Sequence, residues 1–239
     1  HLHFTAAEPY RQRVLQLGES PDRVWVTGAM VLDTLSNFVP VNRLEVEAFL
    51  NIRLLDPVGV VTFHPPTLSP HQSAAHAREL VEALRDSSLR TVVITAPGAE
   101  PERQATWSVF REFASQERTR VVLTESLGHR NYLSLLKYAA VVVGNSSSGV
   151  IEAPFLGTPT VDIGNRQQGR LRGPSVLSAS PERESIGQAV RAALDLGARP
   201  LEGTFSSPYG VPGASSGITE ILETVALDGL IVKEFVDLK

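Results

Sequence analysis

Short apolar runs rich in Val, Ile and Thr recur along this chain, and longer amphipathic segments separate them. Several runs are apolar at consecutive positions, which is typical of parallel strands covered on both faces rather than of half-exposed antiparallel strands. The separating segments carry helical spacing and helix start and stop signals. This alternation predicts an α/β fold with a doubly wound parallel sheet and right-handed crossovers. The predicted strands are 24–26, 58–63, 91–95, 120–123, 140–143 and 159–163, and the main helices are 70–86, 100–116, 129–138, 150–156 and 181–196.

The alternation stops before the carboxyl terminus, which indicates a change in organisation. Residues 1–196 are predicted to form one Rossmann-like domain. Residues 197–217 are rich in Gly, Pro and Ser and are predicted to be a linker. Residues 218–239 are expected to hold two short helices, over 218–227 and 230–238, that pack on this domain or reach toward another one. Because the chain opens with His1 and not with Met, we expect it to be part of a longer protein.

Composition excludes several classes of protein. The absence of cysteine excludes disulfides, thiolate catalysis and cysteine-ligated zinc. The 26 acidic and 22 basic side chains give a net charge of −4, which argues against a general nucleic-acid or membrane-surface binder. The longest aliphatic runs are far too short to span a bilayer. His71 and His76 are five residues apart, not the four of a helical zinc pair, so no metal site is expected.

The strongest local signal is the run Gly144-Asn145-Ser146-Ser147-Ser148-Gly149, between a predicted strand and a predicted helix. A helix N-terminus at the carboxyl end of a parallel strand offers unpaired N–H groups and a positive dipole end, both of which suit a phosphate. Small residues allow a close approach, and the serine hydroxyls add donors. The alternative is a serine-capped helix in an ordinary turn. The run matches neither a nucleophile elbow nor a P-loop.

Three further groups follow predicted strands or begin the same helix. His64 stands before two prolines after the strand 58–63, and either donates to a phosphate oxygen or only caps its loop. Glu152 either accepts from paired ribose hydroxyls or only stabilises the helix start. Arg166 and Arg170 lie in a loop that suits bidentate phosphate capture, the alternative being a solvated polar loop.

Two weaker hypotheses concern the same region. A Ser–His–Asp triad can be assembled on paper from Ser146, His64 and Asp162, but six histidines make such an arrangement easy to find by chance. The stretch 124–130 ends a predicted strand and could line a base pocket through its backbone.

In this order the motifs resemble the carboxyl-terminal half of the hydrolysing UDP-N-acetylglucosamine 2-epimerases. The resemblance is carried by HLHFTAAEPYRQRVLQLGE, HPPT, GNSSSGVIEAPFLGTPTVDIGNRQQGR and the terminal VKEFVDL. The non-hydrolysing branch has a Ser-Gly-Gly type of loop where this chain has GNSSSG, so the resemblance points to the hydrolysing branch. It implies the second Rossmann-like domain of a GT-B type fold, with UDP as the ligand.

The resemblance also implies a role for individual residues. Ser146 and Ser147 would bind the diphosphate, and Glu152 the ribose hydroxyls. Leu127 would meet the uracil through its backbone, and His64 and Arg166 would complete the phosphate site. Further candidates are Gly98, Asn145, Ser148 and Arg170. Gly98 departs from the family, which usually has asparagine at this position, so one hydrogen bond to the ligand is in question.

The implied reaction is hydrolysis with inversion at the second carbon of the sugar, giving N-acetylmannosamine and UDP. By resemblance, the acid–base carboxylates belong to a first domain outside this chain, so no turnover is expected from these residues alone. The resemblance implies a cytoplasmic enzyme that binds UDP or a UDP-N-acetylhexosamine, needs no cofactor, and forms a homo-oligomer (a dimer) at full length. The alternatives are a GT-B glycosyltransferase domain and a non-catalytic sugar-phosphate binding module.

Overall fold

A computed structural model describes residues 1–65, 71–199 and 206–237. The chain divides into two compact units. The sheet unit comprises Val39–Ser206, and the small unit comprises His1–Phe38 together with Ser207–Lys239. No helix in the described ranges is long and apolar enough to cross a membrane.

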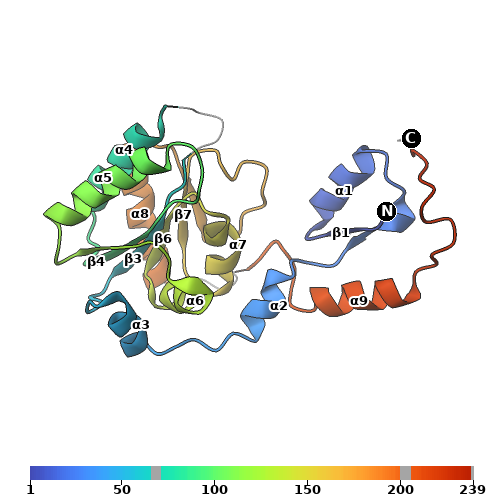
Figure 1. The fold of residues 1–239 in the computed structure, drawn as a ribbon, viewed down its shortest axis with the longest axis horizontal. Coiled ribbons are helices and arrows are strands. Elements are labelled where there is room, and N and C mark those ends of the chain that lie inside the picture. The colour runs from blue at the N-terminus through green and yellow to red at the C-terminus, as the bar shows by residue number, and fades with distance from the viewer. Residues whose placement is uncertain (66–70, 200–205, 238–239) are drawn as a thin grey trace. The chain divides into compact units, whose positions relative to one another are not determined.

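The sheet unit is built on six parallel strands, which confirms the predicted α/β fold with a parallel sheet (Figure 1). The strand order is β5-β4-β3-β6-β7-β8. Chain order therefore runs outward in both directions from β3 and β6, which makes the gap between these two strands the topological switch point. The strands are β3 (Val58–Thr62), β4 (Thr91–Thr95), β5 (Val121–Thr124), β6 (Val141–Gly144), β7 (Thr160–Ile163) and β8 (Val176–Ala179).

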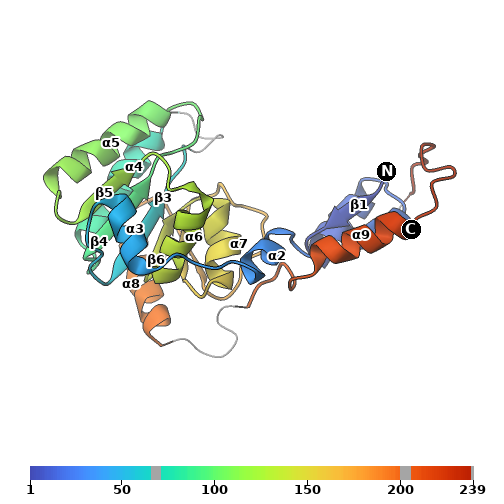
Figure 2. The same cartoon turned by 60° about the horizontal axis from the view of Figure 1, so that its bottom comes forward.

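Helices cover both faces of this sheet, which explains why its central strands are apolar at consecutive positions (Figures 1 and 2). Side chains such as Val61, Val143 and Ile163 pack with one layer of helices in a single hydrophobic core, whereas Val142 and Thr160 point to the other face, toward Gly149. The first layer holds α4 (Ser73–Arg85), α5 (Arg103–Gln116) and α8 (Arg183–Ala198), and the second holds α3 (Arg43–Leu50), α6 (Gly128–Tyr138) and α7 (Ser147–Phe155).

The membership of the sheet differs from the prediction at one strand. Residues 24–26 do form a strand, β2 (Val24–Val26), but it pairs with β1 (His3–Thr5) in a separate two-stranded parallel sheet. The sixth strand of the large sheet is β8, which the apolar pattern did not predict because its central Leu177 and Ser178 are only partly buried or exposed at the sheet edge. Parallel pairing of β7 and β8 runs from Thr160↔Val176 to Ile163↔Ala179.

The small unit joins the two ends of the described chain. Here α1 (Glu8–Gln16) connects β1 to β2, a short 3-10 turn (Pro21–Arg23) precedes β2, and α2 (Val31–Ser36) follows it. The Ala29 N–H donates to the Tyr209 carbonyl, so the segment after β2 is tied to the segment before α9 (Ala214–Thr224). Residues 1–38 therefore belong with the carboxyl-terminal residues, a division that differs from the predicted single domain over 1–196.

The predicted linker and tail also differ from the structure. Residues 214–217 of the predicted linker instead form the first turn of α9, because both carboxylate oxygens of Asp33 accept hydrogen bonds from the N–H groups of Gly213 and Ser215 at the helix start. These hydrogen bonds lower the pKa of Asp33 to about 2. Residues 200–205 of the predicted linker lie outside the described residues.

The second predicted tail helix, over 230–238, is wrong for the residues that the structure describes. Residues 228–231 form turns and 233–237 are irregular. Three consecutive apolar side chains at 230–232 do not make an amphipathic helical face. A hydrogen bond and an ion pair instead hold the irregular segment 233–237. Val236 N–H donates to the Gly18 carbonyl, and Lys233 forms an ion pair of 2.5 Å with Glu19.

Candidate functional site

Asn145 joins the carboxyl ends of the two strands at the switch point. Its side-chain oxygen accepts from the His64 N–H at 2.7 Å, and its side-chain N–H donates to the His64 carbonyl at 2.8 Å. The preceding Gly144 has φ 147°, and a Cβ there would lie 2.0 Å from the Thr62 carbonyl oxygen, so only glycine allows this approach. The side chain of Asn145 is 2% exposed, and it acts as a structural anchor between β3 and β6.

The serine run begins α7 at this point, three residues before the predicted helix start at 150. Ser146 is the N-cap residue and its Oγ accepts from the Ser148 N–H at 3.4 Å. Ser147 is the first residue of the helix. The helix N-terminus therefore opens at the carboxyl edge of the sheet, beside the switch point, where open α/β sheets bind ligands.

The His64 imidazole is partly buried against the loop after β4, and its Nδ1 accepts from the Gly98 N–H at 3.1 Å. Burial, and then the Arg166 charge, lower the pKa of His64 below its usual value. The ring is therefore neutral near pH 7, with its remaining proton on Nε2. In this tautomer His64 can donate one hydrogen bond to an anion.

Arg166 reaches the same place from the loop after β7. Its guanidinium donates to the Asn145 carbonyl at 3.3 Å and forms an ion pair of 3.2 Å with Glu100. The neighbouring Gln167 is buried and donates to the same Asn145 carbonyl at 2.7 Å, which fixes the loop. The structure thus brings His64, Gly98, Asn145 and Arg166 together, and it adds Glu100, which was not among the candidate site residues.

Glu152 lies on α7 beside a residue that the sequence analysis missed. Its carboxylate makes no hydrogen bond or ion pair with the part of the chain that is described, and its charge raises the pKa of the buried Tyr132 phenol in addition to the larger effect of burial. The Ser148 and Thr62 hydroxyls oppose that rise in pKa. Tyr132 is one of several apolar or aromatic positions on α6, so its pattern gave no signal beyond helix packing.

Two predicted residues are not in contact with this cluster among the described residues. Leu127 is the buried N-cap residue of α6, after the edge strand β5, and Arg170 is an exposed residue of the loop after β7. The hypothetical triad of Ser146, His64 and Asp162 is not formed. The Asp162 carboxylate accepts two bonds from Arg172, at 2.7 and 3.1 Å, while Nδ1 of His64 faces Gly98 and Glu100.

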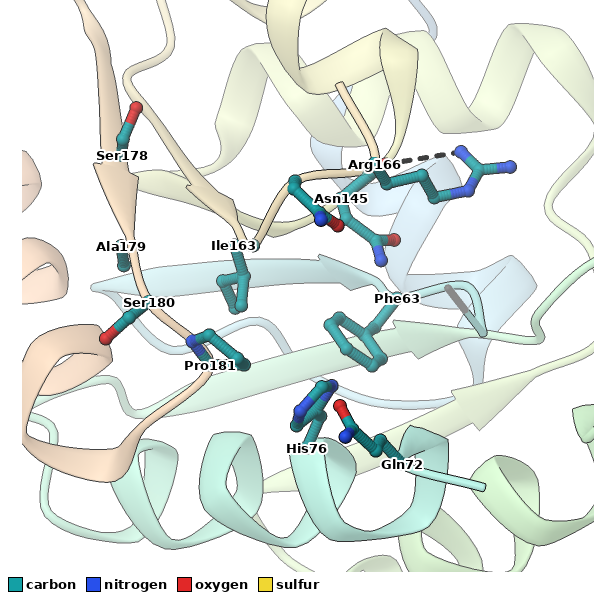
Figure 3. Close-up of a pocket in the computed structure, with 12 residues that line it drawn as sticks. Phe63, Gln72, His76, Asn145, Ile163, Arg166, Ser178, Ala179, Ser180 and Pro181 are labelled. Carbon is teal, nitrogen blue, oxygen red and sulfur yellow. Dashed lines mark hydrogen bonds between the residues drawn. The ribbon is translucent and has the colours of Figure 1, made fainter. Parts of the chain in front are cut away.

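A cavity of about 520 Å³ opens beside this cluster (Figure 3). Of the predicted residues only Asn145 and Arg166 line it, and its other walls include Phe63, His76 and Pro181. The Arg166 side chain extends away from Ile163 and the Ser178–Pro181 wall, as Figure 3 shows. The cavity adjoins the α4 and α8 layer, whereas Ser146–Ser148 and Glu152 belong to α7 on the other face.

The strand order, with a helix N-terminus at the switch point, places the sheet unit in the class of Rossmann-like α/β domains. Comparison with known proteins is more specific. The sequence profile of the family described as "UDP-N-acetylglucosamine 2-epimerase" matches residues 1–223. The chain therefore belongs to the UDP-N-acetylglucosamine 2-epimerase family.

Individual relatives agree with this assignment. The chain is 30% identical over 242 residues to the GDP/UDP-N,N'-diacetylbacillosamine 2-epimerase (hydrolyzing) of Campylobacter jejuni, covering 100% of this chain and 62% of that protein. It is 29% identical over 206 residues to the UDP-N-acetylglucosamine 2-epimerase of Neisseria meningitidis, covering 86% of this chain and 53% of that protein. The chain thus spans between about half and two thirds of the length of these relatives.

The fold agrees with solved structures of this family. The crystal structure of the Neisseria meningitidis UDP-GlcNAc 2-epimerase bound to UDP-GlcNAc has a TM-score of 0.75 and 19% sequence identity, covering 94% of this chain and 62% of that one. At this identity the likeness concerns the fold alone. It confirms that the sheet unit corresponds to part of a GT-B-like epimerase structure.

Proposed function

We propose that this chain is the UDP-binding part of a hydrolysing nucleotide-sugar 2-epimerase, which converts UDP-N-acetylglucosamine and water to N-acetylmannosamine and UDP. The observation that carries the proposal is the convergence of the α7 N-terminus, neutral His64 and Arg166 on the switch point through Asn145. The hydrolysing subtype is supported by the GNSSSG run and by the relative from Campylobacter jejuni, which is described as hydrolyzing. The cytoplasmic location and the dimer stay predictions.

In this function the residues of the chain hold UDP and stabilise it as a leaving group. Ser146, Ser147 and the first N–H groups of α7 would bind the diphosphate, with Arg166 and the Nε2 proton of His64 beside them. Charge develops on the diphosphate when the bond to the sugar breaks. Donors already fixed at that position stabilise the transition state more than the ground state. Glu152 has no internal partner in the described structure, so its carboxylate remains available to the ribose hydroxyls.

Isothermal titration calorimetry with UDP tests the proposal. We expect UDP to bind and Glu152→Gln to weaken binding about tenfold, because one charged acceptor for two hydroxyls is lost, an effect of about 1.4 kcal/mol. Glu184→Gln is the matched control, since Glu184 is also a carboxylate early in a helix, that of α8, and lies outside the site. No heat of binding at millimolar UDP would contradict the proposal.

Other ligands and products separate the alternatives. Tighter binding of N-acetylglucosamine 1-phosphate than of UDP, with no effect of Glu152→Gln, would favour a sugar-phosphate module. For a protein that also supplies the acid–base carboxylates, release of free N-acetylmannosamine indicates the hydrolysing epimerase, and sugar transfer to an acceptor indicates a glycosyltransferase. We expect this chain alone to release no N-acetylmannosamine.

A further inference from the structure

The Glu100 carboxylate lies against the two groups assigned above to anion binding. Its Oε1 is 3.2 Å from His64 Nδ1 and 3.2 Å from a terminal nitrogen of Arg166. Its other oxygen, Oε2, is buried and has no hydrogen-bond partner among the residues that the structure describes. A carboxylate thus occupies the space beside Arg166 that a phosphate oxygen would use.

The Glu100 side chain is weakly held in this position. His64 Nδ1 already accepts from the Gly98 N–H, so in the neutral ring it has no proton to donate to Glu100. The remaining attraction is one ion pair to Arg166, and the two side chains are 24% and 27% exposed. Ion pairs at this exposure contribute little stability because water screens them and the side chains lose freedom. An unsatisfied second oxygen weakens the arrangement further.

The arrangement depends on the absence of a side chain at position 98. A Cβ on Gly98 would lie 2.6 Å from Glu100 Oε2, closer than real contacts allow. The obstructing atom is the end of a flexible side chain, so a larger residue at 98 would displace the Glu100 carboxylate rather than the backbone. Because Gly98 has no side chain, the Glu100 carboxylate can occupy the space beside it.

We propose that Glu100 is an internal counterion that sets the affinity of the anion site: its carboxylate neutralises Arg166 and must turn away before a diphosphate binds there. The identity of the diphosphate as UDP rests on the proposed function, whereas the competition between carboxylate and diphosphate does not. Because the site would otherwise combine one cation with neutral donors, the Glu100 charge opposes every multiply charged anion.

Calorimetry with inorganic pyrophosphate and with UDP tests the proposal in two independent variants. Glu100→Gln keeps the shape and one acceptor but removes the charge, and should tighten pyrophosphate binding about tenfold, or about 1.4 kcal/mol. Gly98→Ala keeps the charge but excludes the carboxylate sterically, and should tighten binding in the same direction. Glu117→Gln is the matched control, because Glu117 also pairs with an arginine, Arg85, at 3.2 Å and comparable exposure, away from the site. It should change neither affinity.

Tighter pyrophosphate binding in both site variants supports the proposal. Unchanged or weaker binding in either one overturns it, and weaker binding in both would make Glu100 a positioning residue for Arg166. If pyrophosphate binds more tightly in both variants while UDP binds to none of the proteins, the counterion is supported and the proposed function fails.

Discussion

Replacing Asn145 with alanine removes both side-chain hydrogen bonds between β6 and the residue after β3. A buried backbone group that loses its partner costs about 1–3 kcal/mol. The substitution leaves two such groups, the N–H and the carbonyl of His64, which gives about 2–6 kcal/mol in total. Because the His64 side chain is 17% exposed, water can reach part of this loop, and we expect a loss of about 2–3 kcal/mol in the free energy of unfolding.

The two tryptophans allow the sheet unit to be measured by itself. Trp107 is 6% exposed in the core of the sheet unit, whereas Trp25 stacks on Phe4 in the small unit. In a Trp25→Phe background, urea unfolding followed by fluorescence therefore reports the sheet unit through Trp107. The midpoint should fall with an unchanged dependence on urea concentration, since the surface exposed on unfolding stays the same.

Asn165→Ala is the control for this measurement. Asn165 is an exposed asparagine in the loop after β7, and its replacement should change stability by less than about 0.5 kcal/mol. UDP affinity should fall in Asn145→Ala but not in the control, because Asn145 fixes the loop of His64. A loss of stability below about 1 kcal/mol in Asn145→Ala would refute the reasoning, since it would mean that His64 needs no internal partner.

Three further substitutions test other parts of the structure. Gly144→Ala should lower stability by about 3 kcal/mol or more, measured by thermal unfolding, because a Cβ would meet the Thr62 carbonyl and φ is positive. Arg172→Met leaves the buried Asp162 carboxylate unpaired and should cost about 3–5 kcal/mol at pH 7. Burial raises the pKa of Asp162, so protonation should reduce this loss at pH 5, measured by urea unfolding at both values. The pKa of Asp33 is lowered from 3.8 to about 2, so its stabilisation of α9 is complete above pH 3.8 and is lost as the pH falls from 3.8 toward 2. Hydrogen exchange of α9 amides should show this loss in the native chain and not in Asp33→Asn.

The central strands could be predicted from sequence because burial on both faces requires a run of consecutive apolar residues. The strands β3, β4 and β6 carry four or five consecutive buried residues each, a pattern that few other elements share. The position of two candidate groups at the sheet edge followed from the same logic, since His64 and the serine run stand directly after two of these strands. A strand at the sheet edge lacks such a run. The four residues of β8 are buried, partly buried, exposed and buried in turn.

The division into units could not be predicted because it depends on contacts between distant parts of the chain. Asp33 caps a helix that begins 181 residues later, and Gly18 accepts a hydrogen bond from Val236. No local spacing encodes either partner. The position of Glu100 has a similar origin, because it depends on the Cβ that Gly98 lacks and on the loop that carries Arg166.

Anchoring and charge are separate properties of this site, and different residues supply them. The Asn145 side chain holds His64 through two partly buried hydrogen bonds, so its loss should lower both stability and affinity. Glu100 contributes a partly exposed charge and an unsatisfied oxygen, so its neutralisation should raise affinity and leave stability nearly unchanged. If both substitutions instead changed stability and affinity in the same direction, the anchoring of the loops and the charge of the site would be a single property. The geometry predicts that they are two, because the hydrogen bonds of Asn145 do not pass through Glu100.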